Sequence, residues 1–139
     1  MPFHRKIILS EGIILWIHFN NNPNENASVG DCVIRALSVA LDQSWDDVFW
    51  LVAEYAYAMG NMPSANAVWG EVLVDNGFTR HILPDTCPMC YRVKDFCRDH
   101  PKGTYVLATW SHVVTAINGD FFDAWNSGSE TVTYYFARG

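Results

Sequence analysis

Cys32 is the residue whose type and position most favour chemistry. It directly follows Gly30 and Asp31 and directly precedes an apolar run at residues 33–41, so its thiol should lie in the first turn of a helix. The free N–H groups and the positive dipole end of a helix stabilise a thiolate at that place. A structural cysteine more commonly lies within an apolar stripe than at the turn that begins one. We therefore interpret Cys32 as a candidate nucleophile.

A nucleophilic cysteine needs a base within hydrogen-bond reach and a third group that orients the base. His112 begins an expected strand, and Asn118-Gly119 is a dipeptide typical of a two-residue hairpin turn. The register set by this turn places Asp123 on the return strand, on the same face as His112 and diagonal to it. We predict Asp123 as the orienting residue. Asn126 is the alternative, because a bulge or a shift of the strand register by one residue would turn its side chain toward His112.

A hydrolase of this kind also needs donors for the oxyanion. The backbone N–H of Cys32 is the first candidate. A side-chain amide from the preceding loop is the second, and we prefer Asn26, six residues before the cysteine, over Asn21, Asn22 and Asn24. Each of these residues alone has an ordinary structural interpretation, such as a buried thiol or a turn amide. Only the ordered combination favours catalysis.

A second group of possible ligands comprises Cys87, Cys90, Cys97 and His100. Four such side chains can hold zinc, but their spacing matches no zinc module that we can identify. Zinc at this group is therefore a minor alternative, a redox-active CxxC is a weaker one, and reduced cysteines are our main expectation. We expect no metal or other cofactor.

The composition limits the remaining classes. The 139 residues suit one domain, half of them are apolar and 14% are aromatic, so a packed core is expected. The net charge is −6, and the absence of a basic stripe argues against nucleic-acid binding. Residues 1–17 superficially resemble a signal peptide, but Glu11 divides the apolar stretch, no cleavage site follows, and the stretch is too short to span a bilayer. We expect a cytoplasmic protein without membrane contact.

The pattern of elements predicts the α+β class, because helices come first and antiparallel strands last. We expect an extension or short strand at residues 1–19 and one domain at 20–139, with Asp31, Ser44 and Ser64 as helix caps. The expected helices are 31–41, 45–59, 64–75 and 93–98, and the expected strands are 78–83, 103–109, 112–117, 120–125 and 131–136. The second helix is apolar beyond one stripe, which makes a homodimer possible.

Five segments together carry a resemblance to a known family. They are VGDCVIRA at 29–36, MPSAN at 62–66, DHPKGTY at 99–105, HVV at 112–114 and DAWNSG at 123–128. Over residues 20–135 the chain resembles the small papain-like cysteine proteases encoded by bacteriophages and by gut Firmicutes. Trp110 stands where that family usually has glycine, and Asn126 stands in place of the second acid of its closing motif.

This resemblance implies a papain-like architecture, in which N-terminal helices with a cysteine at a helix start pack on a C-terminal antiparallel sheet. It implies Cys32 as nucleophile, His112 as general base and Asp123 or Asn126 as the orienting residue. The expected partner is a peptide or protein substrate whose amide bond is hydrolysed through a thioester. Two alternatives remain open, namely an acyltransferase of transglutaminase type and a non-catalytic binding protein on a protease scaffold.

Overall fold

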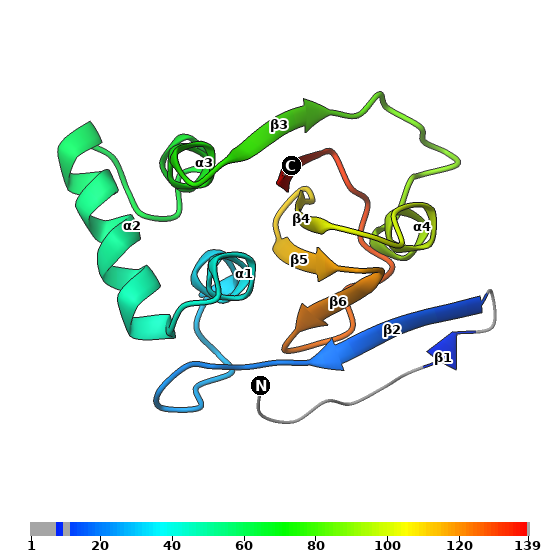
Figure 1. The fold of residues 1–139 in the computed structure, drawn as a ribbon, viewed down its shortest axis with the longest axis horizontal. Helices are drawn as coiled ribbons and strands as arrows, with labels where there is room; N and C mark the ends of the chain where they lie inside the picture. The colour runs from blue at the N-terminus through cyan, green and yellow to red at the C-terminus, as the bar shows by residue number, and fades with distance from the viewer. Residues whose placement is uncertain (1–7, 10–11, 139) are drawn as a thin grey trace.

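The computed structural model describes residues 8–9 and 12–138, and within these ranges it contains four helices and one seven-stranded sheet (Figure 1). The helices are α1 (Cys32–Leu41), α2 (Trp45–Met59), α3 (Asn66–Asp75) and α4 (Val93–Asp99). The strands are β1 (Ile8–Leu9), β2 (Gly12–His18), β3 (Phe78–Ile82), β4 (Thr104–Ala108), β5 (Val113–Ile117), β6 (Asp120–Asp123) and β7 (Tyr134–Arg138). The predicted α+β class is therefore confirmed.

The sheet is mixed and not purely antiparallel as predicted. Its strand order is β1-β2-β6-β5-β4-β7-β3, and all neighbours are antiparallel except β2 and β6. Strand β2 belongs to the segment expected to be an extension or short strand, and it lies parallel to β6 with His18 opposite Asp123. The apolar N-terminal run thus covers the edge of β6, which would otherwise expose unpaired backbone groups.

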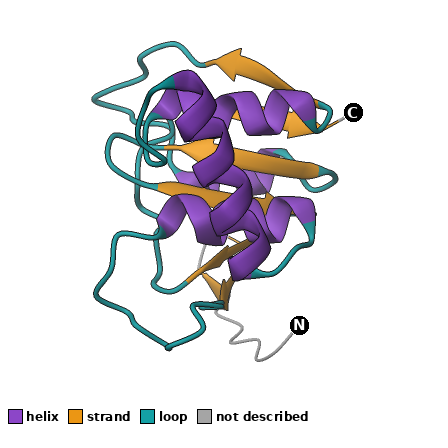
Figure 2. Cartoon of the chain, turned by 90° about the vertical axis from the view of Figure 1, so that its left-hand side faces the viewer, coloured by secondary structure: helices purple, strands orange, loops and turns teal. Residues whose placement is uncertain are grey.

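The sheet separates the two larger of three hydrophobic clusters. In Figure 1 helices α1, α2 and α3 lie on one side of β4, β5 and β6, and α4 lies on the other; Figure 2 shows the first group of helices in front of the strands. Successive side chains of β4 point to opposite faces of the sheet. Val106 therefore packs with the first three helices, while Leu107 packs with α4.

Helix α1 is the central helix of the fold. All its residues are buried except Cys32, Val39 and Leu41, which are partly exposed. The buried hydroxyl of Thr115 on β5 donates a 2.6 Å hydrogen bond to the carbonyl of Ala36. This bond fixes α1 against the strand that follows His112 in the chain.

Several predicted boundaries were wrong, and strand β6, for example, ends at Asp123 and not at 125. Helix α3 begins at Asn66 and its cap position is Ala65, so Ser64 is not its cap. The predicted cap of α2 is confirmed, because the hydroxyl of Ser44 accepts a 3.0 Å bond from the N–H of Asp47. The last strand begins at Tyr134 and not at 131, because residues 131–133 bond instead to Tyr91, Arg92 and Ala108.

No helix in the described ranges is long and apolar enough to cross a membrane. Helix α2 exposes Trp50 and Tyr57, whose exposed fractions are 66% and 91%. The homodimer expected from this helix remains a prediction.

Candidate active site

Cys32 is the first residue of α1, and its thiol lies in a cleft of about 340 Å³. The cleft lies between the start of α1, the segment that begins α3, and the turn that connects β4 to β5. Its lining residues are Gly30, Cys32, Val33, Ser64, Asn66, Trp69, Ala108, Thr109, Trp110, Ser111, His112, Val113 and Tyr134. Chain segments from both halves of the sequence therefore form the walls around the predicted nucleophile.

His112 faces this cleft from the β4–β5 turn. The turn is closed by the backbone N–H and the hydroxyl of Thr109, which donate to the carbonyl of His112 over 2.9 and 3.2 Å. The imidazole faces Cys32 on one side, close enough for each group to shift the pKa of the other. On the other, its Nε2 lies 2.6 Å from Oδ2 of Asp123, which leaves Nδ1 for the thiol. The ring of Trp125 covers the imidazole at a centroid distance of 4.9 Å.

The β5–β6 hairpin brings His112 and Asp123 together in the register predicted from the sequence. Asn118 and Gly119 both have positive φ, of 52° and 84°, as a type I′ turn requires. Ile117 consequently pairs with Asp120. The side chains of His112 and Asp123 then project to the same face.

The carboxylate of Asp123 is fully buried and bonded through both oxygens. Oδ1 accepts from Nε and Nη2 of Arg35, at 3.2 and 3.0 Å, and from the N–H of Ala124 at 2.8 Å. Oδ2 accepts from His112 and, at 2.6 Å, from the hydroxyl of Ser127. With every acceptor position used, the carboxylate holds the imidazole in one orientation.

Asn126, the alternative orienting residue, does not reach the imidazole. Its side chain is exposed, and its Oδ1 accepts a 3.1 Å bond from the N–H of Gly128. The structure thus brings Asp123, and not Asn126, to His112.

Arg35 is a site residue that the sequence analysis missed. Its Nη1 lies 2.9 Å from Oδ1 of Asp31, and it binds Asp123 through its other nitrogens. A continuous series of contacts therefore runs from Asp31 through Arg35, Asp123 and His112 to Cys32. The sequence did contain a signal for this role, because Asp31 and Arg35 are four residues apart at the start of a largely apolar helix, a spacing that favours an ion pair.

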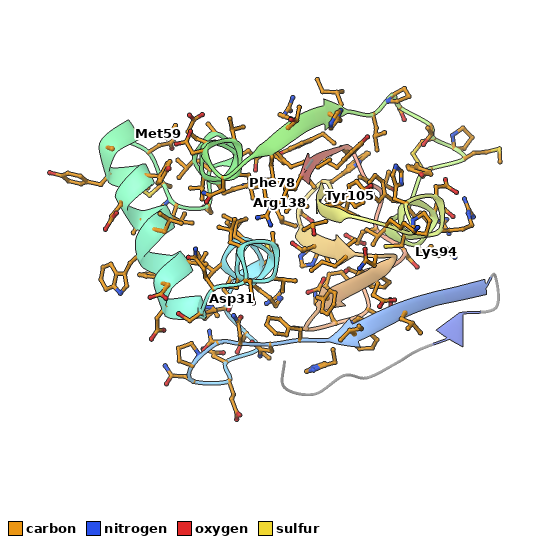
Figure 3. All side chains as sticks on the ribbon, viewed as in Figure 1. Asp31, Met59, Phe78, Lys94, Tyr105 and Arg138 are labelled. Atoms are coloured by element: carbon orange, nitrogen blue, oxygen red, sulfur yellow. A yellow bond between two sulfur atoms is a disulfide. The ribbon has the colours of Figure 1, made fainter. Side chains whose placement is uncertain are left out.

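The side chain of Asp31 does not cap α1 as predicted. The residue occupies the cap position, but its side chain makes no cap hydrogen bond. Besides Arg35, it binds Nε1 of Trp45 at 3.0 Å and Nδ2 of Asn22 at 3.2 Å, both through Oδ2. Figure 3 labels Asp31 between the first turn of α1 and the end of α2 opposite Met59. A buried arginine one turn away is a stronger partner for this carboxylate than the helix N–H groups.

The electrostatics of the site favour a thiolate–imidazolium pair. Burial by itself would raise the pKa of the Cys32 thiol, but the hydrogen bond to His112, the imidazolium charge, the N–H of Val113 and the charge of Arg35 together lower it. Burial would likewise lower the pKa of His112, but its bonds to Asp123 and Cys32 raise that pKa to about 9. Both shifts favour the charged forms.

The amide predicted for the oxyanion lies outside the cleft lining. Asn26 is exposed, and its Oδ1 accepts from the N–H and hydroxyl of Ser28 at 2.9 and 3.0 Å. The buried amide of this loop is Asn22, which binds Asp31. The side-chain amide that does line the cleft is that of Asn66. Its Oδ1 accepts a hydrogen bond from Nε1 of Trp69, so its NH₂ group can donate to a ligand.

The second cysteine group is divided between a disulfide and a buried helix. Cys87 and Cys90 form a disulfide with each other, which corrects the expectation that these thiols are reduced. Cys97 is buried in the α4 core, where burial raises its pKa to about 12, and Nδ1 of His100 bonds to the carbonyl of Phe96. No group of three or more potential metal ligands occurs among the described residues, so the structure gives the zinc alternative no support. The cytoplasmic location remains a prediction.

Trp110 lies at the edge of the cleft without filling it. Its side chain is 81% exposed. An indole that is so largely exposed leaves the space between Cys32 and the α3 segment open. A tryptophan at this position is therefore compatible with entry of a ligand into the cleft.

No protein-family model, curated protein or solved structure matches this chain. The functional class must therefore be argued from the contacts among Cys32, His112 and Asp123.

Proposed function

We propose that the chain is a papain-like cysteine hydrolase that cleaves an amide bond of a peptide or protein. The observation that carries this proposal is the position of the His112 imidazole, which lies beside the Cys32 thiol in the same cleft and is hydrogen-bonded to the Asp123 carboxylate. A base held in this way between a nucleophile and an orienting acid is the arrangement that acyl-transfer chemistry requires.

In the first half-reaction, the proton of the Cys32 thiol is held by His112 and the sulfur attacks the substrate carbonyl carbon. The carbonyl oxygen becomes an oxyanion, which accepts a hydrogen bond from the backbone N–H of Cys32. That N–H belongs to the first turn of α1, where backbone donors have no partner within the helix. The C–N bond then breaks, His112 gives its proton to the leaving amine, and the acyl group remains on the sulfur as a thioester.

In the second half-reaction, neutral His112 takes a proton from water as the water oxygen attacks the thioester carbonyl. The C–S bond breaks, the acid product leaves, and Cys32 returns as a thiolate next to protonated His112. Asp123 keeps the imidazole in one orientation through both steps and stabilises its positive charge. The amide of Asn66 is placed to donate to the substrate backbone in the cleft.

The proposal is tested by incubating the protein with a defined peptide mixture and identifying products by mass spectrometry. We expect cleavage by the wild-type protein and by Cys97→Ser, the matched control at the other free cysteine, and none by Cys32→Ser. Acid quenching should capture the thioester on Cys32. Cleavage that survives Cys32→Ser, or the absence of any acyl-enzyme and product, would contradict the proposal. Adding a primary amine separates hydrolysis from acyl transfer, because only a transferase would make the amide in preference to the acid.

A further inference from the structure

A second cavity, of about 430 Å³, lies beside the cleft. The two cavities share Gly30, Val33 and Ser64. We call this cavity the side pocket; its lining residues are Asn22, Pro23, Asn24, Asn26, Val29, Gly30, Asp31, Val33, Ile34, Trp45, Phe49, Pro63 and Ser64. Its volume is within the range of pockets that bind small organic groups.

The walls of the side pocket are largely apolar. Trp45 and Phe49, one turn apart at the start of α2, stack with a centroid distance of 5.2 Å. Ile34 contributes from α1, and Val29, which is 45% exposed, lies at the entrance loop. Apolar side chains that line an open cavity next to a nucleophile gain free energy when an apolar group of the substrate replaces water there.

The charge of the pocket also favours a neutral occupant. Asp31 is the acidic residue of the lining and could in principle attract a basic side chain. Its Oδ1 is bound to Arg35, however, and its Oδ2 to Trp45 and Asn22, and only 8% of the residue is exposed. A buried carboxylate that already pairs with an arginine and accepts two further N–H bonds is a poor partner for a basic side chain of a substrate.

The position of the pocket relative to His112 indicates which part of the substrate it receives. His112 must lie next to the leaving amine, because it supplies that amine with a proton. The acyl part therefore extends away from His112, across Cys32 toward Gly30 and Val33. The side pocket lies on that side, since it shares Gly30 and Val33 with the cleft, and none of its lining residues comes from the turn that carries His112.

We propose that the side pocket binds a large apolar side chain, aliphatic or aromatic, of the acyl part of the substrate, next to the carbonyl that Cys32 attacks. This inference rests on the proposed function and names its substrate class. Phe49 and Ile34 would form the wall and floor that set the size of the accepted side chain.

The test compares rates of Cys32 alkylation by N-acetyl aminoacyl chloromethyl ketones that differ only in the side chain next to the ketone. We expect benzyl and isobutyl reagents to react about tenfold or more faster than the methyl, carboxymethyl and aminobutyl reagents. Phe49→Ala should reduce the ratio of benzyl to methyl rates, whereas Tyr57→Ala, on the same helix but outside the pocket, should leave it unchanged.

A second pair of variants keeps the test independent of folding effects in α2. Val29→Asp places a charge at the pocket entrance and should slow the benzyl reagent selectively, while Val74→Asp, at a similarly exposed position on α3, should not. Equal rates across the reagent series, or a preference that neither Phe49→Ala nor Val29→Asp changes, would overturn the inference. Iodoacetamide has no side chain for the pocket to bind, so it tests the proposed function alone. If the chloromethyl ketones react at equal rates but iodoacetamide labels Cys32 rapidly, only the pocket inference is overturned. If iodoacetamide also labels Cys32 slowly, the proposed function is overturned as well.

Discussion

Arg35 and Asp123 form a buried ion pair, with Nη2 3.0 Å from Oδ1 and side-chain exposures of 8% and 1%. The pair joins the helix that carries Cys32 to the end of the strand that orients His112. It thereby connects the nucleophile and its base through the interior of the protein, in addition to their direct contact. Because Arg35 also binds Asp31, one guanidinium is shared between two buried carboxylates.

Replacing Arg35 by methionine should be strongly destabilising. The substitution leaves Asp31 and Asp123 buried without their cation, and breaking a buried pair in this way costs about 3–5 kcal/mol. Urea unfolding monitored by tryptophan fluorescence measures the loss. Arg98→Met is the matched control, because the side chain of Arg98 is half exposed and its ion pairs with Asp95 and Asp99 lie at the surface. Equal losses in the two variants would contradict the role given to Arg35.

Replacing Asp123 by asparagine should lower the pKa of His112 from about 9 toward its ordinary value of 6.5, because the carboxylate is a main cause of the upward shift. Peptide cleavage should fall by a factor of about 100 or more. Asn126→Ala should change neither quantity, since Asn126 binds only within its own turn. The pKa is measured by NMR titration of the imidazole. A larger effect from Asn126→Ala than from Asp123→Asn would show that the orienting residue is misassigned.

The stability of Cys32→Ser should depend on the titration of His112. In this variant Asp123 still raises the pKa of His112 above 6.5, because their hydrogen bond remains. A raised folded-state pKa gives stabilisation that is fully present below the unfolded pKa and is lost as pH rises through the folded one. The free energy of unfolding should therefore decrease above pH 6.5, and His112→Ala in the same background should remove this decrease. A decrease that persists without His112 must come from another group.

Cys97 should be unreactive in the folded protein. It is 2% exposed, and burial raises its pKa to about 12. At pH 8 we expect alkylation of Cys97 only in the presence of denaturant, whereas Cys32 reacts in the native state. Peptide mapping after timed labelling distinguishes the two thiols. Native-state labelling of Cys97 at the rate of Cys32 would show that the α4 core is not closed as described.

Much of the site could be predicted because its geometry is local. The Asn118-Gly119 turn determines the pairing of the two strands that it joins, and this pairing alone places Asp123 next to His112. The position of Cys32 likewise follows from the place where the polar loop ends and the apolar helix begins. Both inferences depend on contacts between residues that are near in sequence or connected by a tight turn.

The parts that could not be predicted depend on distant contacts. Strand β2 pairs with β6 across about a hundred residues of chain, and no local pattern specifies that partner or its parallel direction. The role of Arg35 depends on the simultaneous burial of Asp31 and Asp123, which only the packed helix and sheet bring within reach. The disulfide of Cys87 and Cys90 required the loop conformation that sets their Cα atoms 4.2 Å apart.

The most direct measurement is the rate of iodoacetamide labelling of Cys32 across pH, in the wild-type protein and in His112→Ala, with His81→Ala as the control for an exposed histidine. We predict that wild-type Cys32 reacts rapidly well below the ordinary thiol pKa of 9.0, and that His81→Ala behaves like wild type. In His112→Ala the reaction should become slow and shift to alkaline pH, because the thiol loses its principal stabilising partner. Slow labelling of wild-type Cys32, with the same pH dependence in all three proteins, would contradict the claim that His112 ionises Cys32.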